Sequence, residues 1–522
     1  MATPTCVLGL EEGPEPPVEL LWLGGAVLAS LAAVTLSKWW RVAAQRNGAP
    51  GARIGSAAAG GKSSKAKTYP EYDIAEVKKH KTAEDAWVVV GKGVYDVTKW
   101  AKRHPGGERN IIDISGRDVT DVFEAFHRDP RQRRKLEVFR VGTLVGYEPS
   151  ALVKDFRALK EDITAEGLFE IDNWFFIKRF VLLLPLLALA AWIIVTNRGC
   201  TRVQLFGAGL VGFFWQQLAF LGHDAGHRTH LANRGEPDRL LNRGFAAYCV
   251  VLPLLGIGPE WWMDSHNIHH VVCNDVKCDP DIQHLPFMAI SPKFFESLYS
   301  VYHDRVMVFD FLGRCLVSVQ HILFYPLMCV SRTFLYLQSI LFVLTKKRAK
   351  HRVHELAAFT VFFCWNAYLC AHLQGAWARV GYFMMSHAVS GILHVQITLS
   401  HFSMPVTEVP QYRDDAEGWV ATQLGTTLDV DCYRCLDWFH GGLQFQALHH
   451  LFPLLPRYNL RTVQSRVRAL AEKHEIQYHC YSFLDANIKT FYSMRETAKQ
   501  AWSSRDFKFQ ESMLYEGITL VG

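Results

Sequence analysis

The hydrophobic and polar positions divide the chain into a first part with short apolar runs and a second part with long ones. Residues 180–196 and 203–221 are nearly uncharged and joined by a short polar connector, so they predict a helical hairpin long enough to cross a membrane. Residues 357–372 and 380–399 predict a second hairpin. Because each hairpin begins and ends on one side of the membrane, the polar segments beside both are expected to share that side.

Three other apolar segments do not follow this hairpin pattern. Residues 20–36 form a short uncharged run between an acidic tail and a basic stretch, which predicts an uncleaved membrane anchor with the following chain in the cytosol. A signal or plastid-targeting segment is the alternative. Residues 245–258 are interrupted by Gly and Pro, which favours an interfacial or re-entrant segment. Residues 318–345 contain Pro326 and Arg332 and are expected to lie along the membrane interface.

Composition changes along the chain and predicts six segments. Short runs such as 87–90 and 94–97 indicate β-strands in a soluble domain. In chain order the segments are an N-terminal tail with a membrane anchor (1–46), a flexible linker rich in Gly, Ala, Ser and Lys (47–68), the soluble domain (69–146), a second linker (147–175), a membrane domain (176–500) and a C-terminal tail (501–522).

Charge and cysteine content narrow the function only a little. The net charge of +6 gives no reason to expect a nucleic-acid partner. The 12 cysteines are scattered, and the close pair Cys432 and Cys435 has no second pair with which to form a zinc site. A reducing, cytosol-facing environment fits this cysteine usage best.

Candidate chemistry comes from the histidines, because seven of the 23 fall into three short clusters beside apolar segments. Helical residues at i, i+3 and i+4 share a face, so each cluster can present its imidazoles in one direction. Three such faces would supply enough nitrogen ligands for two metal ions, and neutral imidazole suits iron, copper, zinc and nickel. A single pair could be a chance match or a core histidine, but three clusters together predict a polynuclear metal site. The clusters are His223-Asp-Ala-Gly-His227, His266-Asn-Ile-His269-His270 and Gln446-Ala-Leu-His449-His450.

The soluble domain contains His104-Pro-Gly-Gly107 after Tyr95-Asp-Val-Thr98, and His127 follows His104 by 23 residues. This segment resembles cytochrome b5. The resemblance implies an α+β domain that holds haem b between two axial imidazoles, His104 and His127. Since both axial positions would be filled, the resemblance implies a carrier of electrons that does not bind oxygen.

The second half of the chain resembles the membrane fatty-acyl desaturases, specifically the front-end group fused to cytochrome b5. That group has Gln in place of the first His of its third cluster, as at Gln446, and the stretches 279–286 and 437–453 are similar to plant sphingolipid delta-8 and acyl-lipid delta-6 desaturases. The resemblance implies an all-α polytopic membrane domain with a cytosolic cap, joined to the α+β haem domain. It also implies a site for two iron ions whose ligands are His223, His227, His266, His269, His270, His401, Gln446, His449 and His450.

Two features near these clusters are open to more than one interpretation. His394 lies two helical turns before His401, where a second site histidine and a core histidine are both expected. Asp224, Asp264 and Asp279 could orient histidine rings as hydrogen-bond acceptors or serve as surface or capping carboxylates.

The resemblance implies an O2-dependent enzyme that inserts a double bond at the delta-8 position of a sphingoid long-chain base. Delta-6 or other front-end desaturation of polyunsaturated acyl chains, hydroxylation by the same di-iron site, and a haem protein merely anchored by its membrane half are the alternatives. The implied partners are the lipid, the membrane and NADH-cytochrome b5 reductase. The implied location is the endoplasmic reticulum membrane, with the haem domain and di-iron site facing the cytosol, and a plastid membrane is the alternative.

Overall fold

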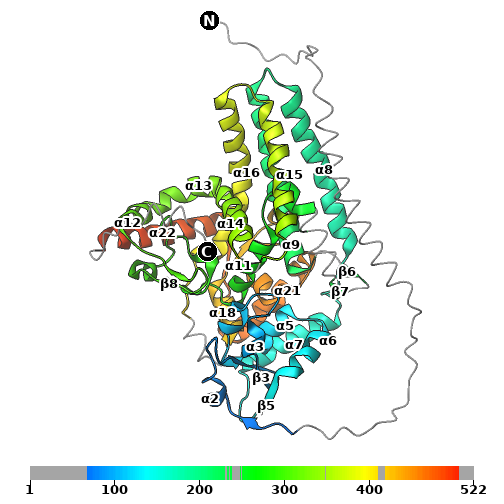
Figure 1. The fold of residues 1–522 in the computed structure, drawn as a ribbon, viewed down its shortest axis with the longest axis vertical. Helices are drawn as coiled ribbons and strands as arrows, with labels where there is room; N and C mark the ends of the chain where they lie inside the picture. The colour runs from blue at the N-terminus through cyan, green and yellow to red at the C-terminus, as the bar shows by residue number, and fades with distance from the viewer. Residues whose placement is uncertain are drawn as a thin grey trace, which may run out of the picture.

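The computed structural model describes residues 68–229, 250–346, 349–408 and 418–504, together with residues 232, 233, 236, 237 and 247. The predicted N-terminal anchor, the linker up to residue 67 and the tail from residue 505 lie outside these residues. In Figure 1 long helices occupy one end of the molecule and a small domain with a sheet occupies the other. The predicted fold class, an α+β domain joined to a helical domain, is confirmed.

The small domain is built on a five-stranded sheet in the order β1-β5-β3-β2-β4. Val88 pairs with Tyr95 in the antiparallel hairpin of β2 and β3, and Gly91 in its turn adopts a φ of 63°, which favours glycine. The two strands predicted from the apolar runs are therefore found. The strands are β1 (Glu71–Tyr72), β2 (Trp87–Val90), β3 (Gly93–Asp96), β4 (Arg117–Asp118) and β5 (Arg140–Leu144), and the helices are α2 (Ile74–Val77), α3 (Thr98–Ala101), α4 (Arg109–Ile112), α5 (Thr120–Phe126) and α6 (Pro130–Leu136).

Four long helices form the opposite end: α8 (Asn173–Thr196), α9 (Thr201–His227), α15 (Arg352–Ala371) and α16 (Ala376–Phe402). All four were predicted as helices, and each extends beyond its apolar run. Among the described residues, α8, α9 and α15 are long and apolar enough to cross a membrane, and one bent pair of helices would make a fourth span. α16 is not among these three, and several of its polar side chains, including Ser390 and His394, are buried inside the protein.

Further helices, most of them shorter, surround this bundle. The bent pair α12 and α13 changes direction by 92°, and in Figure 1 these two helices and α22 lie crosswise to the long ones, as a segment along a membrane interface would. These helices are α10 (Leu252–Leu255), α11 (Pro259–Val271), α12 (Phe311–Ser318), α13 (Gln320–Val330), α14 (Arg332–Thr345), α18 (Gly418–Thr426), α19 (Asp437–His440), α20 (Gln446–Leu451), α21 (Arg457–Lys473) and α22 (Phe483–Ser503). The remaining strands pair as β6 (Ala232–Asn233) with β7 (Glu236–Pro237), β8 (Tyr299–Ser300) with β9 (Arg305–Val306), and β10 (Asp429–Asp431) with β11 (Cys480–Ser482).

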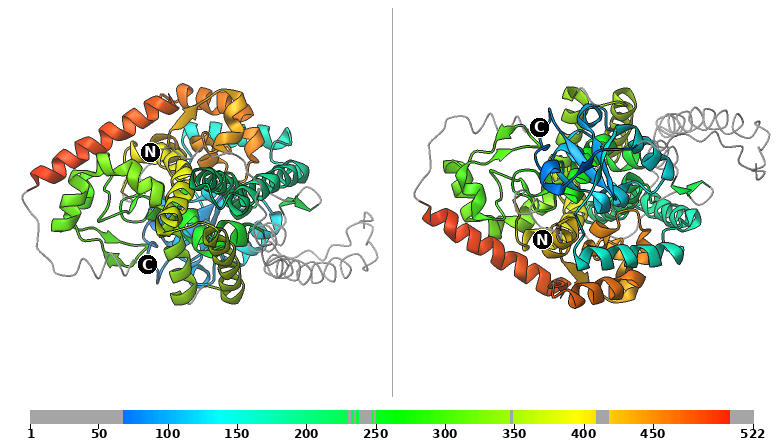
Figure 2. Two further views of the ribbon diagram at one scale, coloured as in Figure 1. Left: turned by 90° about the horizontal axis from the view of Figure 1, so that it is seen from above. Right: turned by 90° about the horizontal axis from the view of Figure 1, so that it is seen from below.

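The small domain and the helical domain share one hydrophobic core. Val122 and Ala125 of α5 belong to the same buried cluster as Leu448 of α20. The second predicted linker contains helix α7 (Ala151–Ala165), which begins at a Ser150 side chain that accepts a hydrogen bond from Val153 N. Seen from below in Figure 2, the blue sheet of the small domain lies over the middle of the helical part. The two domains are therefore packed against each other and are not separated by an extended tether.

Helix α7 holds the two domains together with contacts on both sides. Phe156 of α7 stacks on Phe452, which follows α20, with ring centroids 5.3 Å apart. Arg157 reaches the small domain and forms an ion pair of 2.8 Å with Asp121 on α5. His474 at the end of α21 lies 2.6 Å from Asp155. An apolar stack and charged contacts thus fix the orientation of the small domain relative to the helical domain.

Candidate metal centres and haem site

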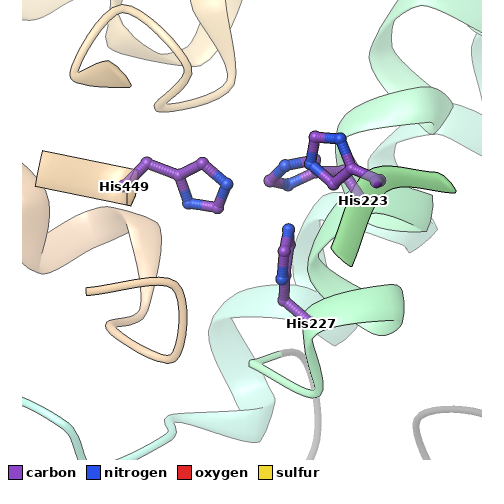
Figure 3. A group of neighbouring side chains, drawn as sticks. His223, His227 and His449 are labelled. Atoms are coloured by element: carbon purple, nitrogen blue, oxygen red, sulfur yellow. The ribbon is translucent and has the colours of Figure 1, made fainter. Parts of the chain in front are cut away.

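The first group of candidate ligands brings together three helices. His223 and His227 lie at the end of α9, His266 on α11 and His449 on α20, and their ligand atoms all lie within 4.8 Å of one another. Figure 3 shows the rings of His223, His227 and His449 pointing toward a common centre. Two ligands on opposite sides of one ion would be roughly 4 Å apart with metal–imidazole bonds of about 2 Å. The group therefore has the size of a single-ion site.

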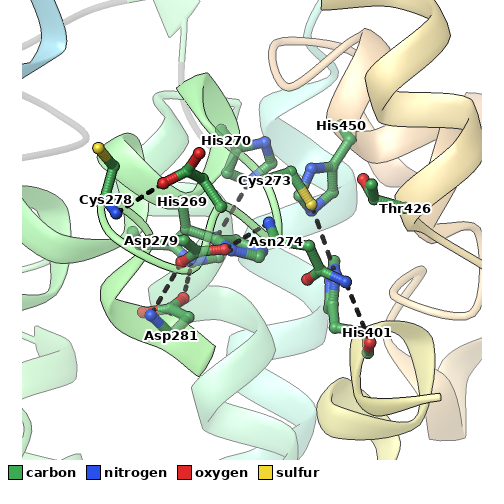
Figure 4. Close-up of polar contacts among 12 residues, drawn as sticks. His269, His270, Cys273, Asn274, Cys278, Asp279, Asp281, His401, Thr426 and His450 are labelled. Carbon is green, nitrogen blue, oxygen red and sulfur yellow. Dashed lines mark hydrogen bonds and ion pairs between the residues drawn. The ribbon is translucent and has the colours of Figure 1, made fainter. Parts of the chain in front are cut away.

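The second group lies beside the first and contains His269 on α11, His401 at the end of α16, His450 on α20 and Cys273. All four side chains are buried, and their ligand atoms also lie within 4.8 Å of one another. Cys273 Sγ is 3.6 Å from His401 Nδ1, and Figure 4 shows both beside His450. The sequence predicted the three histidines but not the cysteine. Its i+4 spacing from His269 is the pattern from which it could have been found.

His270 lies between the two groups and belongs to neither. Its Nε2 is 3.1 Å from Nε2 of His266 in the first group. Its ring stacks on His450 of the second group, with centroids 4.1 Å apart. Its own Nδ1 is buried without a hydrogen-bond partner among the described residues. His270 is therefore a predicted ligand that contacts both groups without belonging to either.

Gln446 lies against the second group, where its amide nitrogen is 3.1 Å from His401 Nε2 and 3.3 Å from His450 Nε2. Its Oε1 atom is buried and lacks a hydrogen-bond partner within the described part of the chain. The oxygen and nitrogen of an amide can exchange places by rotation about χ3, and the exchanged form would turn Oε1 toward these ring nitrogens. The side chain therefore has the position of a weak oxygen donor to the second group.

The division of each cluster between two groups follows from helix geometry. Adjacent residues on an α-helix point about 100° apart. His449 and His450 therefore face different directions from the same helix, and one enters each group. On α11, His266 and His269 share a face but lie about 4.5 Å apart along the helix axis, so one enters each group. Paired histidines on α11 and α20 thus allow two helices to supply both groups at once.

Polar partners hold several of these rings in place. His269 Nδ1 is 2.8 Å from Asp279 Oδ2, and neither side chain is exposed by more than 3%. His266 Nδ1 is 3.2 Å from the partly exposed Asp281, and His450 Nδ1 is 2.7 Å from Gln423 Oε1. Each contact occupies Nδ1 and leaves Nε2 directed at the group. A carboxylate or amide acceptor of this kind fixes the ring and its tautomer.

Asp224, Asp264 and Asp279, which were predicted either to orient histidine rings or to act as surface or capping carboxylates, differ in their contacts. Asp279 contacts His269 and also caps its own loop by accepting from Asn274 N and Asp281 N. Asp224 forms an ion pair of 2.7 Å with Arg457 and lies 3.5 Å from His223. Asp264 accepts a hydrogen bond from the Tyr302 hydroxyl. His394, the second open case, lies outside both groups and contacts Ser331 at 2.8 Å.

The lowered pKa of most of these rings suits metal binding. Burial, followed by the charge of neighbouring imidazoles, holds the pKa of His270, His449 and His450 well below the usual histidine range. Burial also lowers the pKa of His269, but Asp279 and Asp281 outweigh this effect and the net pKa is raised. Neutral imidazole is the form that binds metal. The Nε2 atoms of His223, His227 and His449 are buried and lack hydrogen-bond partners among the described residues, which fits a metal ion as their missing partner.

Asp279→Asn is expected to reduce metal affinity of the second group by about 10- to 100-fold, because Asp279 is the buried charge that orients His269. The measurement is metal content after dialysis against graded chelator. Asp281→Asn is the matched control, since Asp281 is partly exposed and its contact with His266 is longer. Equal losses in the two variants would contradict a special role for Asp279.

The two histidines of the small domain also face each other. His104 follows α3 and His127 follows α5, and their ring centroids are 6.0 Å apart. His104 Nδ1 contacts Gly107 O at 3.1 Å and His127 Nδ1 contacts Phe123 O at 2.9 Å, so both Nε2 atoms remain available. An iron bound by both rings at about 2 Å would place the centroids roughly 6 Å apart. The pair therefore fits a haem iron.

Burial keeps both histidines of this pair neutral, and a tight backbone turn lies beside His104. Burial lowers the pKa of His104, and burial together with His104 lowers the pKa of His127 to about 4, so both rings are neutral at physiological pH. A Cβ on Gly106 would come within 3.0 Å of the His104 ring, and Gly107 has a φ of 102°. Gly106 and Gly107 thus let the chain turn tightly beside His104.

Comparison with known proteins identifies two domains in the chain. Residues 202–482 match the fatty acid desaturase family, and residues 73–145 match the cytochrome b5-like heme/steroid binding domain. The chain is 38% identical to a Helianthus annuus protein called delta(8)-fatty-acid desaturase, over 82% of this chain and 91% of that protein. It is 38% identical to an acyl-lipid (9-3)-desaturase of Borago officinalis, over 82% and 93% of the two chains. It is 38% identical to a delta 8-(E)-sphingolipid desaturase of Kluyveromyces lactis, over 67% and 60%. The chain therefore belongs to the fatty acid desaturase family, with a cytochrome b5-like domain fused ahead of the desaturase domain.

Proposed function

We propose that this protein is a front-end desaturase that uses O2 to insert a double bond at the delta-8 position of a sphingoid long-chain base. The observation that supports this most is the convergence of two buried histidine groups beside the haem-type histidine pair. Two of the relatives named above are called delta-8 desaturases, one of them of sphingolipids. The reaction converts CH2–CH2 to CH=CH, and the substrate's two hydrogens, two further electrons and two protons reduce O2 to two waters.

Two iron ions and one haem b are the cofactors of this proposal. The first group and the second group would each hold one iron, and His270 and Gln446 would complete the ligand set. His104 and His127 would hold the haem, and NADH-cytochrome b5 reductase would reduce it. Bound iron would supply the O2 activation that protein side chains lack.

The chain's own residues position this chemistry. Asp279 and Gln423 hold two rings of the second group, as described above. Trp262 stacks on His266 with centroids 4.4 Å apart and contacts His223 and His227 edge-on, so it forms an apolar wall of the first group. The side chains of His223 and His266 are each 12% exposed, whereas His401 and His450 are more deeply buried. We infer that the lipid approaches from the first group, while the buried second group excludes water.

The proposed location is the endoplasmic reticulum membrane, with the haem domain and both histidine groups on the cytosolic side. The helices that cross a membrane in this proposal are α8, α9, α15 and α16. His227 ends α9 and His401 lies at the end of α16, so each hairpin returns its last residues to the side on which the small domain lies. Protease digestion of sealed microsomes should therefore cut tags placed beside the haem domain from outside.

The substrate is tested by expression in a yeast whose long-chain bases lack a delta-8 double bond, with no fatty acid supplied. The expected product is a long-chain base lighter by two hydrogens, since desaturation removes two hydrogens and hydroxylation adds an oxygen. Mass spectrometry of bases and acyl chains, measured separately, decides the result. Unchanged bases with a new double bond in supplied polyunsaturated acyl chains would favour delta-6-type activity, which the relative called an acyl-lipid desaturase keeps as the second candidate.

Gln446→Ala is expected to abolish desaturation and to lower the iron content toward one per chain, because the variant removes an amide beside two ring nitrogens of the second group. The measurements are product yield and iron per haem. Gln444→Ala is the matched control, since Gln444 is also buried but donates its hydrogen bond to Asp437. Full activity and two irons in Gln446→Ala would show that the amide is only structural.

A further inference from the structure

The haem-type pair and the metal groups are joined by one aromatic contact. α5 ends at Phe126, and the next residue is His127. The Phe126 ring meets the His270 ring edge to face, with centroids 6.2 Å apart and planes at 87°. The residue that is peptide-bonded to one candidate haem ligand therefore touches a histidine of the metal site.

His270, the histidine that Phe126 contacts, lies against both metal groups. Its ring centroid is 4.8 Å from His227 and 4.6 Å from His449 in the first group. It is 4.1 Å from His450 in the second group. An electron that reaches the His270 ring is therefore one ring contact away from either group.

The contact is held in place from both domains. Arg228, the residue after His227, donates from Nη2 to Phe126 O at 2.7 Å. Val122 and Ala125, on the same helix as Phe126, are buried in the core that includes Leu448 of α20. The fixed orientation set by α7 was described above. Phe126 is therefore positioned by packing and by a backbone hydrogen bond, and it does not depend on a chance encounter between tethered domains.

We propose that Phe126 is the bridging residue through which the docked haem domain delivers electrons to both metal groups, by way of His127 and His270. The inference rests on the proposed function. Electron tunnelling weakens steeply with distance through space and less steeply along bonded or closely packed atoms. One electron passes in each transfer, and no bond or proton changes at Phe126. Two transfers supply the two electrons that the reaction with O2 requires.

The test measures electron transfer separately from product formation, in the full-length holoenzyme. The haem is reduced with NADH and reductase without oxygen, then mixed with O2 and lipid substrate while haem absorbance is followed by stopped flow. Phe126→Leu is expected to slow haem reoxidation by about tenfold or more, as when a reacting geometry is loosened. Its haem spectrum, haem potential and iron content should match those of the wild type. Phe126→Tyr, which keeps the aromatic ring, should restore the rate.

Two controls separate a bridge from a packing residue. Phe169 lies at the same domain boundary, where its ring packs on Phe452 and beneath the guanidinium of Arg128. Among the described residues it makes no ring contact with His270. Phe169→Leu should therefore reoxidise its haem at the wild-type rate. When dithionite reduces the metal groups directly, Phe126→Leu should form product in a single turnover as the wild type does, because the electrons no longer pass through the haem domain.

The outcomes are distinguishable. A wild-type rate of haem reoxidation in Phe126→Leu, or equal slowing in Phe169→Leu, would overturn the bridge while leaving the desaturase proposal intact. A wild-type protein that forms no desaturated lipid would overturn the proposed function first. If Phe126→Leu loses haem, Phe126→Met provides a second non-aromatic side chain, and the same expectations apply to it.

Discussion

Alanine at His449 or at His450 is expected to eliminate desaturation and to remove about one metal ion per chain in each variant. The two residues are neighbours on α20, yet His449 enters the first group and His450 the second. Each substitution takes away one of the imidazole donors of one ion and leaves the other group's donors in place. Because O2 chemistry in this proposal needs both ions, either loss alone should stop it.

Metal content per chain and product yield are the measurements for this pair. The absorption spectrum of the haem should stay unchanged, since α20 does not contribute to the His104–His127 pair. His474→Ala is the matched control, because His474 contacts Asp155 on α7 and lies outside both groups. Two full metal sites and full activity in either His449→Ala or His450→Ala would refute the assignment of these residues as ligands.

Alanine at His104 or His127 is expected to abolish the low-spin spectrum of a haem with two imidazole ligands, and to abolish NADH-driven product formation. Both rings are partly buried, and the Nδ1 atom of each contacts a backbone carbonyl. Either substitution would leave a bound haem with one imidazole ligand in place of two, so the haem would be lost or its spectrum would change. Without it, the electrons from the reductase have no route to the metal groups.

Visible absorption, haem content and metal content test this second expectation. The metal groups should keep their ions, because their ligands lie on α9, α11, α16 and α20. His80→Ala is the control within the same domain, where His80 stacks on Trp87 and contacts Asp85. An intact haem spectrum in His127→Ala would mean that another residue is the ligand.

The structure changes how electron delivery is understood in this chain. The sequence predicted a linker at 147–175 between the soluble domain and the membrane domain. The structure places helix α7 in that segment, with contacts to both domains. Packing of α7 and of the shared core makes the position of Phe126 beside His270 a fixed feature. Flexibility of the linker is therefore not needed for the electrons to arrive.

Local spacing in the sequence was enough to identify most of the site. A helix places residues at i, i+3 and i+4 on one face, so His223 with His227 and His266 with His269 and His270 could be recognised as clusters before any fold was known. The glycines after His104 and the short apolar runs of β2 and β3 could be recognised for the same reason, because each depends on residues close in sequence. The four long helices followed from the lengths of their apolar runs.

Only the tertiary structure decided which partners those faces meet. Whether His449 faces His223 or His401 depends on packing between α9, α16 and α20, which are separated by many residues and by several turns of chain. The same packing brought Cys273 into the second group, left His394 outside it, and selected Asp279 over Asp264 as the acceptor for a cluster histidine. A sequence pattern determines the direction of a side chain relative to its own helix. The position of the neighbouring helix depends on packing throughout the core. That packing therefore determines the composition of the two metal groups and the contact of Phe126 with His270.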